Sequence, residues 1–213
     1  MKLESLRHIV VEGPIGVGKS TLARALAQRL GARLLLERPQ DNPFLERFYA
    51  DGSRYALQTQ LVFLFQRLEQ LRELAQPGMF ERGTVADFMF DKDALFARLT
   101  LSDDEYRLYC QIHSAVAPQV MPPDLVIWLQ ASPPTLLSRV HRRGIRMEQD
   151  IGEDYLARIA DAYGEHFDHA PQLPVLAVDS ERFNPQARAS DLDRLVERLQ
   201  RFRGPREQLE DAA

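Results

Sequence analysis

Residues 13–20 read Gly13-Pro14-Ile15-Gly16-Val17-Gly18-Lys19-Ser20, which satisfies the pattern G-x-x-x-x-G-K-[ST]. The motif follows a short apolar run and precedes a stretch with helical periodicity. A phosphate-binding loop of this type is expected in that position, between a strand and a helix. Glycines let the backbone wrap closely around an anion, so that successive N–H groups and the helix N-terminus point at a β-phosphate. The motif therefore predicts a phosphate-binding loop, with Gly13, Gly16 and Gly18 among its nucleotide-binding residues.

The end of the motif supplies the charged and metal-binding groups of this loop. Lys19 is expected to bridge the β- and γ-phosphates and to act in catalysis, and the Ser20 hydroxyl is a hard oxygen ligand suited to Mg²⁺. Thr21, the next residue, is counted with them as nucleotide-binding. The predicted cofactors are ATP and Mg²⁺.

Outward from this loop, short β-branched runs alternate with longer helical stretches, which is the pattern of parallel strands joined by crossover helices. The expected strands are His8–Glu12, Arg33–Glu37, Met79–Glu81, Leu125–Leu129 and Val175–Val178. The expected helices are Ser53–Ala75, Asp87–Leu99, Ser102–Val120, Pro134–Arg143, Glu153–Phe167 and Ala187–Phe202. The sequence therefore predicts a three-layer α/β P-loop fold, in which helices flank a five-stranded parallel sheet.

Composition limits the class of protein. The 213 residues fit a single domain, residues 1–203, followed by a polar and frayed tail, residues 204–213. The net charge of −4 argues against a nucleic-acid polymer as partner, because such binding needs clustered Lys and Arg. With Cys110 as the single cysteine, the chain cannot form an internal disulfide, and this is consistent with a reducing cytoplasm. The apolar run near the N-terminus is too short to span a membrane.

Charged residues end two of the expected strands. In a parallel sheet the carboxyl ends of the strands face the same crevice as the loop, so Glu37 is placed to accept a proton from a substrate hydroxyl. Glu81 is expected to hold Mg²⁺ through water, and Arg82 to bridge the attacking oxygen and the γ-phosphate. The alternative for Glu37 is an ion pair with Arg38 or a cap on a following helix, and the alternative for Glu81 and Arg82 is an exposed ion pair.

A basic segment follows the fourth expected strand. It reads Arg139-Val140-His141-Arg142-Arg143-Gly144-Ile145-Arg146-Met147-Glu148. Four arginines within eight residues, with a glycine as hinge, predict a lid over about residues 139–152 that closes cations over the triphosphate. Arg139, Arg143 and Arg146 are the arginines expected to bind the nucleotide. A solvated helix face is the alternative.

Several stretches together carry a resemblance to a known family. They are GPIGVGKST, LLLERPQDNPFLERFY, LQTQLVFLFQRLEQL, FERGTVAD and RVHRRG, followed by Glu148. In this order and spacing the chain resembles the deoxynucleoside kinase family, particularly the bacterial deoxyadenosine/deoxyguanosine kinases. Two departures are Gly83, where relatives usually have Ser or Thr, and Ile145, where an arginine is frequent.

The resemblance implies an acceptor site. Glu37 would be the general base at the 5′-hydroxyl of a deoxynucleoside, and Arg82 the catalytic arginine. Tyr49 and Glu148 would bind the 3′-hydroxyl. Gln60, Asp87 and Arg67 would read the base, with purine favoured and deoxycytidine possible. Gln60 and Arg67 are seven residues apart, so a helix presents them on one face.

The resemblance also implies a homodimer, built from the helices expected at Ser53–Ala75 and Ser102–Val120.

Two other functions stay open at this point. A thymidylate-type monophosphate kinase would need extra cations near the second strand, where Arg38 and Arg47 are outnumbered by acidic residues. A GTPase-like switch would need an Asn-Lys-x-Asp motif, which the sequence does not contain.

Overall fold

The computed structural model describes residues 6–72, 74, 83–117, 120–170 and 172–209. Strand β1, His8–Glu12, leads into the glycine-rich loop as predicted, and helix α1, Lys19–Leu30, follows the loop. The expected strand Met79–Glu81 lies outside the described residues. No helix in the described ranges is long and apolar enough to cross a membrane.

Among the described residues, the sheet has six parallel strands in the order β2-β3-β1-β4-β5-β6. The strands besides β1 are β2 Arg33–Leu35, β3 Thr84–Ala86, β4 Leu125–Gln130, β5 Val175–Asp179 and β6 Arg206–Gln208. The parallel α/β fold is confirmed, and the count of five is corrected to six. The added strand comes from the segment expected to be a frayed tail. Its backbone pairs with Val175–Ala177, and an edge strand needs no apolar run to do so.

Strand β3 determines which residues face the loop, and its position differs from the expected one. Thr84 is paired with His8 and Ala86 with Val10, so β3 runs beside β1 from its start. Gly83, with φ +111°, directly precedes the strand, and a Cβ there would lie 2.8 Å from the Leu6 carbonyl oxygen. Asp87 is therefore the residue that leaves the third strand at the carboxyl edge of the sheet.

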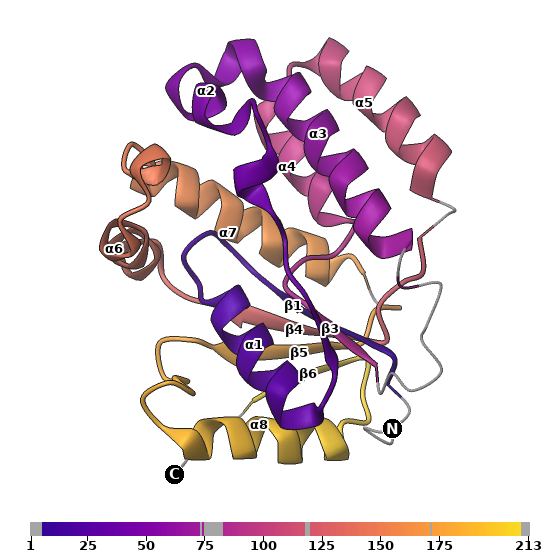
Figure 1. Ribbon diagram of the computed structural model, residues 1–213, viewed down its shortest axis with the longest axis vertical. Helices are drawn as coiled ribbons and strands as arrows, with labels where there is room; N and C mark the ends of the chain where they lie inside the picture. The colour runs from indigo at the N-terminus through magenta and orange to yellow at the C-terminus, as the bar shows by residue number, and fades with distance from the viewer. Residues whose placement is uncertain (1–5, 73, 75–82, 118–119, 171, 210–213) are drawn as a thin grey trace.

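Helices cover both faces of the sheet (Figure 1). They are α2 Leu45–Ala50, α3 Gly52–Arg72, α4 Lys92–Thr100, α5 Asp103–Val116, α6 Pro133–Arg143, α7 Glu153–Asp168 and α8 Ala189–Arg201. Alternate side chains of β1 point to opposite faces: Val11 packs in a core with α1 and α8, whereas Val10 packs in a core with α3, α4 and α7. These two cores make the three predicted layers.

The helix expected at Asp87–Leu99 begins five residues later, at Lys92. The intervening residues are held by polar contacts to other elements: Asp87 bonds the backbone N–H of Glu37, and the N–H of Met89 donates to Glu12 at 3.0 Å. Helical periodicity alone did not show these contacts. The late start places Lys92 at the N-terminus of α4, beside the crevice.

Candidate active site

The glycine-rich loop is packed against the sheet and against α6. A Cβ on Gly13 would lie 2.4 Å from the carbonyl oxygen of Leu129, and one on Gly16 would lie 2.8 Å from that of Leu136. Both glycines also have positive φ, at 143° and 85°. Glycine is therefore required at both positions for the loop to approach β4 and α6 this closely.

The Lys19 ammonium lies inside the loop. Its Nζ donates to the carbonyl oxygens of Gly13 at 2.7 Å and Pro14 at 2.9 Å. Burial lowers the pKa of Lys19 to about 8, the charge of Lys92 acts in the same direction, and nearby carboxylates such as that of Glu37 oppose both. The loop thus holds a cation where a triphosphate would lie along the backbone amides.

The buried carboxylate of Glu12 holds the start of the glycine-rich loop. Glu12 is fully buried, and its Oε2 accepts hydrogen bonds from the Gly13 N–H at 2.9 Å and the Tyr163 hydroxyl at 2.7 Å. Its Oε1 accepts the bond from Met89. Glu12 thereby ties the loop to α7 and to the segment before α4. We had not predicted this role, because from the sequence Glu12 only ends an apolar strand.

Asp87 connects the loop to the acceptor side. One carboxylate oxygen accepts a hydrogen bond from the Ser20 hydroxyl, and the other accepts one from the Glu37 backbone N–H at 2.7 Å. The resemblance had implied that Asp87 reads the base. The structure places its carboxylate beside Ser20, the residue expected to bind Mg²⁺, because Asp87 directly follows β3.

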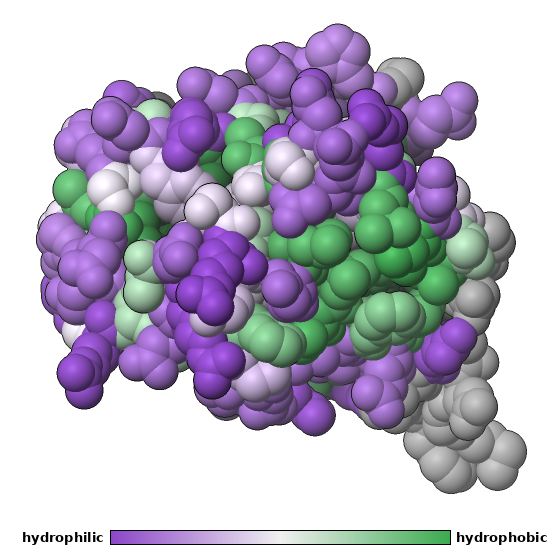
Figure 2. Space-filling view, turned by 90° about the horizontal axis from the view of Figure 1, so that it is seen from above, coloured by the Kyte–Doolittle hydropathy of each residue, from purple (hydrophilic) through white to green (hydrophobic). Residues whose placement is uncertain are grey.

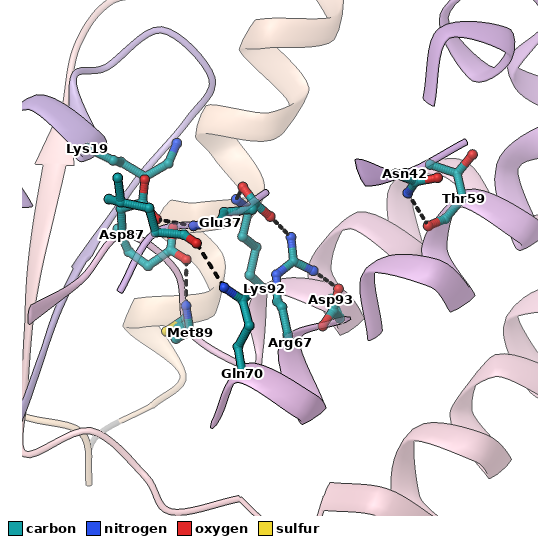
Figure 3. A network of polar contacts seen from close by, with 12 residues as sticks. Lys19, Glu37, Asn42, Thr59, Arg67, Gln70, Asp87, Met89, Lys92 and Asp93 are labelled. Carbon is teal, nitrogen blue, oxygen red and sulfur yellow. Dashed lines mark hydrogen bonds and ion pairs between the residues drawn. The ribbon is translucent and has the colours of Figure 1, made fainter. Parts of the chain in front are cut away.

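Glu37 lies between two cations (Figure 3). Its Oε1 accepts a hydrogen bond from Arg67, and its Oε2 accepts one from Lys92 Nζ at 2.9 Å. Burial raises the pKa of Glu37, but the charges of Arg67, Lys92 and Lys19 outweigh burial and hold it well below its usual range. Glu37 is therefore an ionised carboxylate that faces the same cavity as the loop.

Arg67 carries a second ion pair, with Asp93 at the start of α4. The Asp93 side chain is fully buried and that of Arg67 is 4% exposed. The Arg67 guanidinium also lies over the ring of Phe63, 4.9 Å from its centroid. Asp93 and Glu37 are thus the two carboxylates that orient Arg67. Gln60 lines the same cavity, as its helical spacing from Arg67 predicted, and donates to Thr100 Oγ1 at 3.3 Å.

Tyr49 and Glu148 both line the cavity, from α2 and from the turn after α6. Burial raises the pKa of the Tyr49 hydroxyl, and the neighbouring Tyr155 and Glu148 raise it further. Glu148 also pairs with Arg143. The structure therefore brings together the two residues that the resemblance paired, and Arg143 joins them to the lid.

The lid arginines fall into two groups. Arg139 donates to the Ser180 hydroxyl and carbonyl oxygens, both at 2.8 Å, and to the Val17 carbonyl of the loop at 3.2 Å. Arg139, Arg142 and Arg143 line the cavity. Arg146, which was expected to bind the nucleotide, is exposed and lies outside the cavity lining, whereas Arg142 lines the cavity although it was not among the expected residues.

One cavity of about 570 Å³ joins these groups, from the loop to α3 and to the segment around Phe183. The Ser20 hydroxyl and the Asp87 carboxylate offer hard oxygens to Mg²⁺, which usually keeps water and substrate phosphates as its other ligands. In the described ranges no group of three or more His, Cys, Asp or Glu side chains forms a complete metal site. The predicted site residues Glu81 and Arg82 lie outside those ranges.

Comparisons with known proteins agree with this geometry. A family model described as deoxynucleoside kinase matches residues 9–202. The chain is 33% identical to the deoxyguanosine kinase of Bacillus subtilis (strain 168), across 88% of this chain and 93% of that one. It is 33% identical to the deoxyadenosine kinase of Dictyostelium discoideum, across 83% and 73%. The solved deoxyadenosine kinase from M. mycoides with dCMP and dCDP shares the fold at a TM-score of 0.79 and 24% identity, across 90% and 97%.

Proposed function

Because the chain belongs to the deoxynucleoside kinase family, we propose that it transfers the γ-phosphoryl group of ATP to the 5′-hydroxyl of a purine deoxynucleoside. That the protein is an ATP-dependent deoxynucleoside kinase follows from the family. One observation carries the proposed roles: Lys19 in its loop and the Glu37 carboxylate face a single cavity. Purine is favoured because the relatives named above are deoxyguanosine and deoxyadenosine kinases.

On the donor side, the loop amides and Lys19 hold the triphosphate, and Arg139, Arg142 and Arg143 neutralise its outer oxygens. Mg²⁺, when bound, neutralises charge on the β- and γ-phosphates. Ser20 and Asp87 are the residues that would hold it. The segment around Phe183 borders the donor end of the cavity, where a base would lie.

On the acceptor side, Glu37 receives the proton of the 5′-hydroxyl. Its low pKa makes it a weak base, but phosphoryl transfer passes through a loose transition state in which the proton need leave only late. Tyr49 and Glu148 hold the 3′-hydroxyl. Gln60 and the Arg67–Asp93 pair present a hydrogen-bond pattern to the base.

The test is a substrate panel. Deoxyadenosine, deoxyguanosine, deoxycytidine, thymidine and their 5′-monophosphates are each offered with ATP, and ADP formation is measured. We expect the purine deoxynucleosides to give the largest kcat/KM, and Lys19→Ala to abolish ADP formation at saturating substrate. Turnover of the monophosphates alone would identify a thymidylate-type kinase instead.

The proposal also includes the assembly and location of the enzyme. Figure 2 shows hydrophobic surface on the side formed by α3 and α5. Phe65 on α3 is 52% exposed and Leu108 on α5 is 47% exposed. These helices are the ones expected to pair in a homodimer. Cytoplasmic location is supported by the single cysteine and by the use of ATP.

A further inference from the structure

Lys92 is a buried cation on the acceptor side that the sequence did not single out. It is the first residue of α4, its side chain is 7% exposed, and it lines the cavity. Its Nζ lies 2.9 Å from Glu37 Oε2 and 5.6 Å from the ring centroid of Phe96. An ammonium has three N–H donors. Within the described part of the chain, only Glu37 accepts a hydrogen bond from it.

The two cations that hold Glu37 are not equivalent. Arg67 is occupied on both sides, by Glu37 and by Asp93, and its planar guanidinium is thereby fixed. Lys92 forms an ion pair with Glu37 alone among the described residues. Its remaining donors are therefore available to a substrate that lies against Glu37, whereas those of Arg67 serve largely to hold the pocket together.

Lys92 also lies near the Lys19 ammonium of the nucleotide loop, in the same cavity. Its charge contributes to the lowered pKa of Lys19, so the two ammonium groups are close enough to interact. Only three of the 27 basic residues in the sequence are lysines: Lys2, Lys19 and Lys92. Two of the three line this cavity. A compact ammonium on a flexible chain can follow a moving oxygen, as the rigid fork of arginine cannot.

We propose that Lys92 is the catalytic cation on the acceptor side, contacting the attacking 5′-oxygen and the γ-phosphoryl oxygens during transfer. In that step the bond between the 5′-oxygen and the γ-phosphorus forms, and the bond from the γ-phosphorus to the β–γ bridging oxygen breaks. ADP leaves with the electron pair, and the hydroxyl proton passes to Glu37. Lys92 stays protonated and stabilises the charge on the transferring oxygens. The inference rests on the proposed function.

Arg82 is the competing candidate for this role, by resemblance. It lies outside the described residues. Among the described residues, Gly83 lies next to Leu6 and Arg7 directly before β3, and Asp87 directly follows the carboxyl end of β3. In the described ranges, Lys92 pairs with Glu37 and lines the cavity. Unlike Arg67, it has no second carboxylate partner there.

The experiment compares Lys92→Met, Lys92→Arg, Arg82→Met and the control Arg98→Met, which removes an exposed charge from the same helix. For each we measure kcat and KM with the best deoxynucleoside, the Kd of a non-hydrolysable ATP analogue, and the melting temperature. Lys92→Met should lower kcat about 10²–10³-fold with little change in Kd or melting temperature. Lys92→Arg should recover part of the loss, and Arg98→Met should match wild type.

A spectroscopic readout separates catalysis from structure. With three lysines, the ¹³Cε-lysine spectrum is simple, and the Lys92 signal is identified by its loss in Lys92→Met. That signal should shift when the deoxynucleoside and the ATP analogue bind together.

Wild-type kcat in Lys92→Met, or a Lys92 signal that does not respond to substrates, would overturn the inference. In that case loss of turnover in Arg82→Met would assign the role to the arginine. Failure of the wild-type enzyme to phosphorylate any deoxynucleoside is a different result, which refutes the proposed function itself.

Discussion

Glu37 combines a position suited to catalysis with a charge environment that weakens it as a base. Glu37→Gln preserves the shape of the side chain but removes its charge and its ability to accept a proton. We expect kcat to fall roughly 10²–10⁴-fold, with the affinity for ATP nearly intact. Steady-state kinetics and ATP titration of this variant test the point, beside Glu46→Gln, an exposed control on α2. Wild-type kcat in Glu37→Gln would remove Glu37 from the mechanism.

Arg67 and Asp93 form a buried pair whose two halves depend on each other. Arg67→Met leaves the fully buried Asp93 carboxylate without its partner, which typically costs about 3–5 kcal/mol. The double variant Arg67→Met/Asp93→Leu removes both charges and should recover much of that loss. Urea denaturation measures all three proteins. A double variant less stable than Arg67→Met would show that the pair is not coupled in this way.

The residues of the nucleotide loop were predictable because the motif is local in sequence. Lys92 and Asp93 were not, because their roles depend on where α4 begins. Asp87 shows the same limit. The sequence identifies the residue as an aspartate, but its contact with Ser20 depends on the register of β3 against β1. Local pattern identifies the loop, and tertiary contacts decide which carboxylate meets which cation.

At the level of elements, helix α5 starts with a capping box, in which Ser102 and Glu105 interact. Glu105 Oε2 accepts hydrogen bonds from the Ser102 backbone N–H at 3.0 Å and the Ser102 hydroxyl at 2.7 Å. Ser102→Ala removes the hydroxyl and should lower the free energy of unfolding by about 1 kcal/mol. Thermal denaturation measures this, with Ser138→Ala, an exposed serine inside α6, as a control that should show no loss.

Element boundaries were less predictable than the elements themselves. Helix α3 ends at Arg72, whereas we expected Ala75, and β2 ends two residues before Glu37. Strand β6 has no apolar pattern, because its backbone pairs at the sheet edge while its side chains stay partly exposed. Periodicity detects buried faces, so it finds central strands and amphipathic helices but not a polar edge strand.

For the whole molecule, stability should depend on pH through a buried histidine. Burial lowers the pKa of His8 to about 4, with Asp124 opposing the shift, whereas the unfolded chain titrates near 6.5. The unfolded state therefore binds more protons between these values, and the free energy of unfolding should fall as the pH drops from about 6.5 to about 4.

His8→Leu should flatten that dependence above about pH 5.5, where the carboxylates of the unfolded chain still take up few protons. Some slope should remain, because burial also lowers the pKa of His113. Urea titrations at several pH values measure the slope. An unchanged slope in the variant would mean that His8 does not govern acid stability in this range.

The assembly is the property of the whole molecule that depends most on the surface over α3 and α5. Exposed apolar side chains gathered on one face mark association sites in soluble proteins. If two copies bury this face, the mass in light scattering should be twice 24.4 kDa. Leu108→Glu combined with Phe65→Asp would place like charges in that interface and should yield monomers. Arg29→Glu changes an exposed residue on α1, across the sheet from α3 and α5, and should leave the dimer intact. A wild-type monomer, or a dimer that survives the double substitution, would show that this face is not the interface.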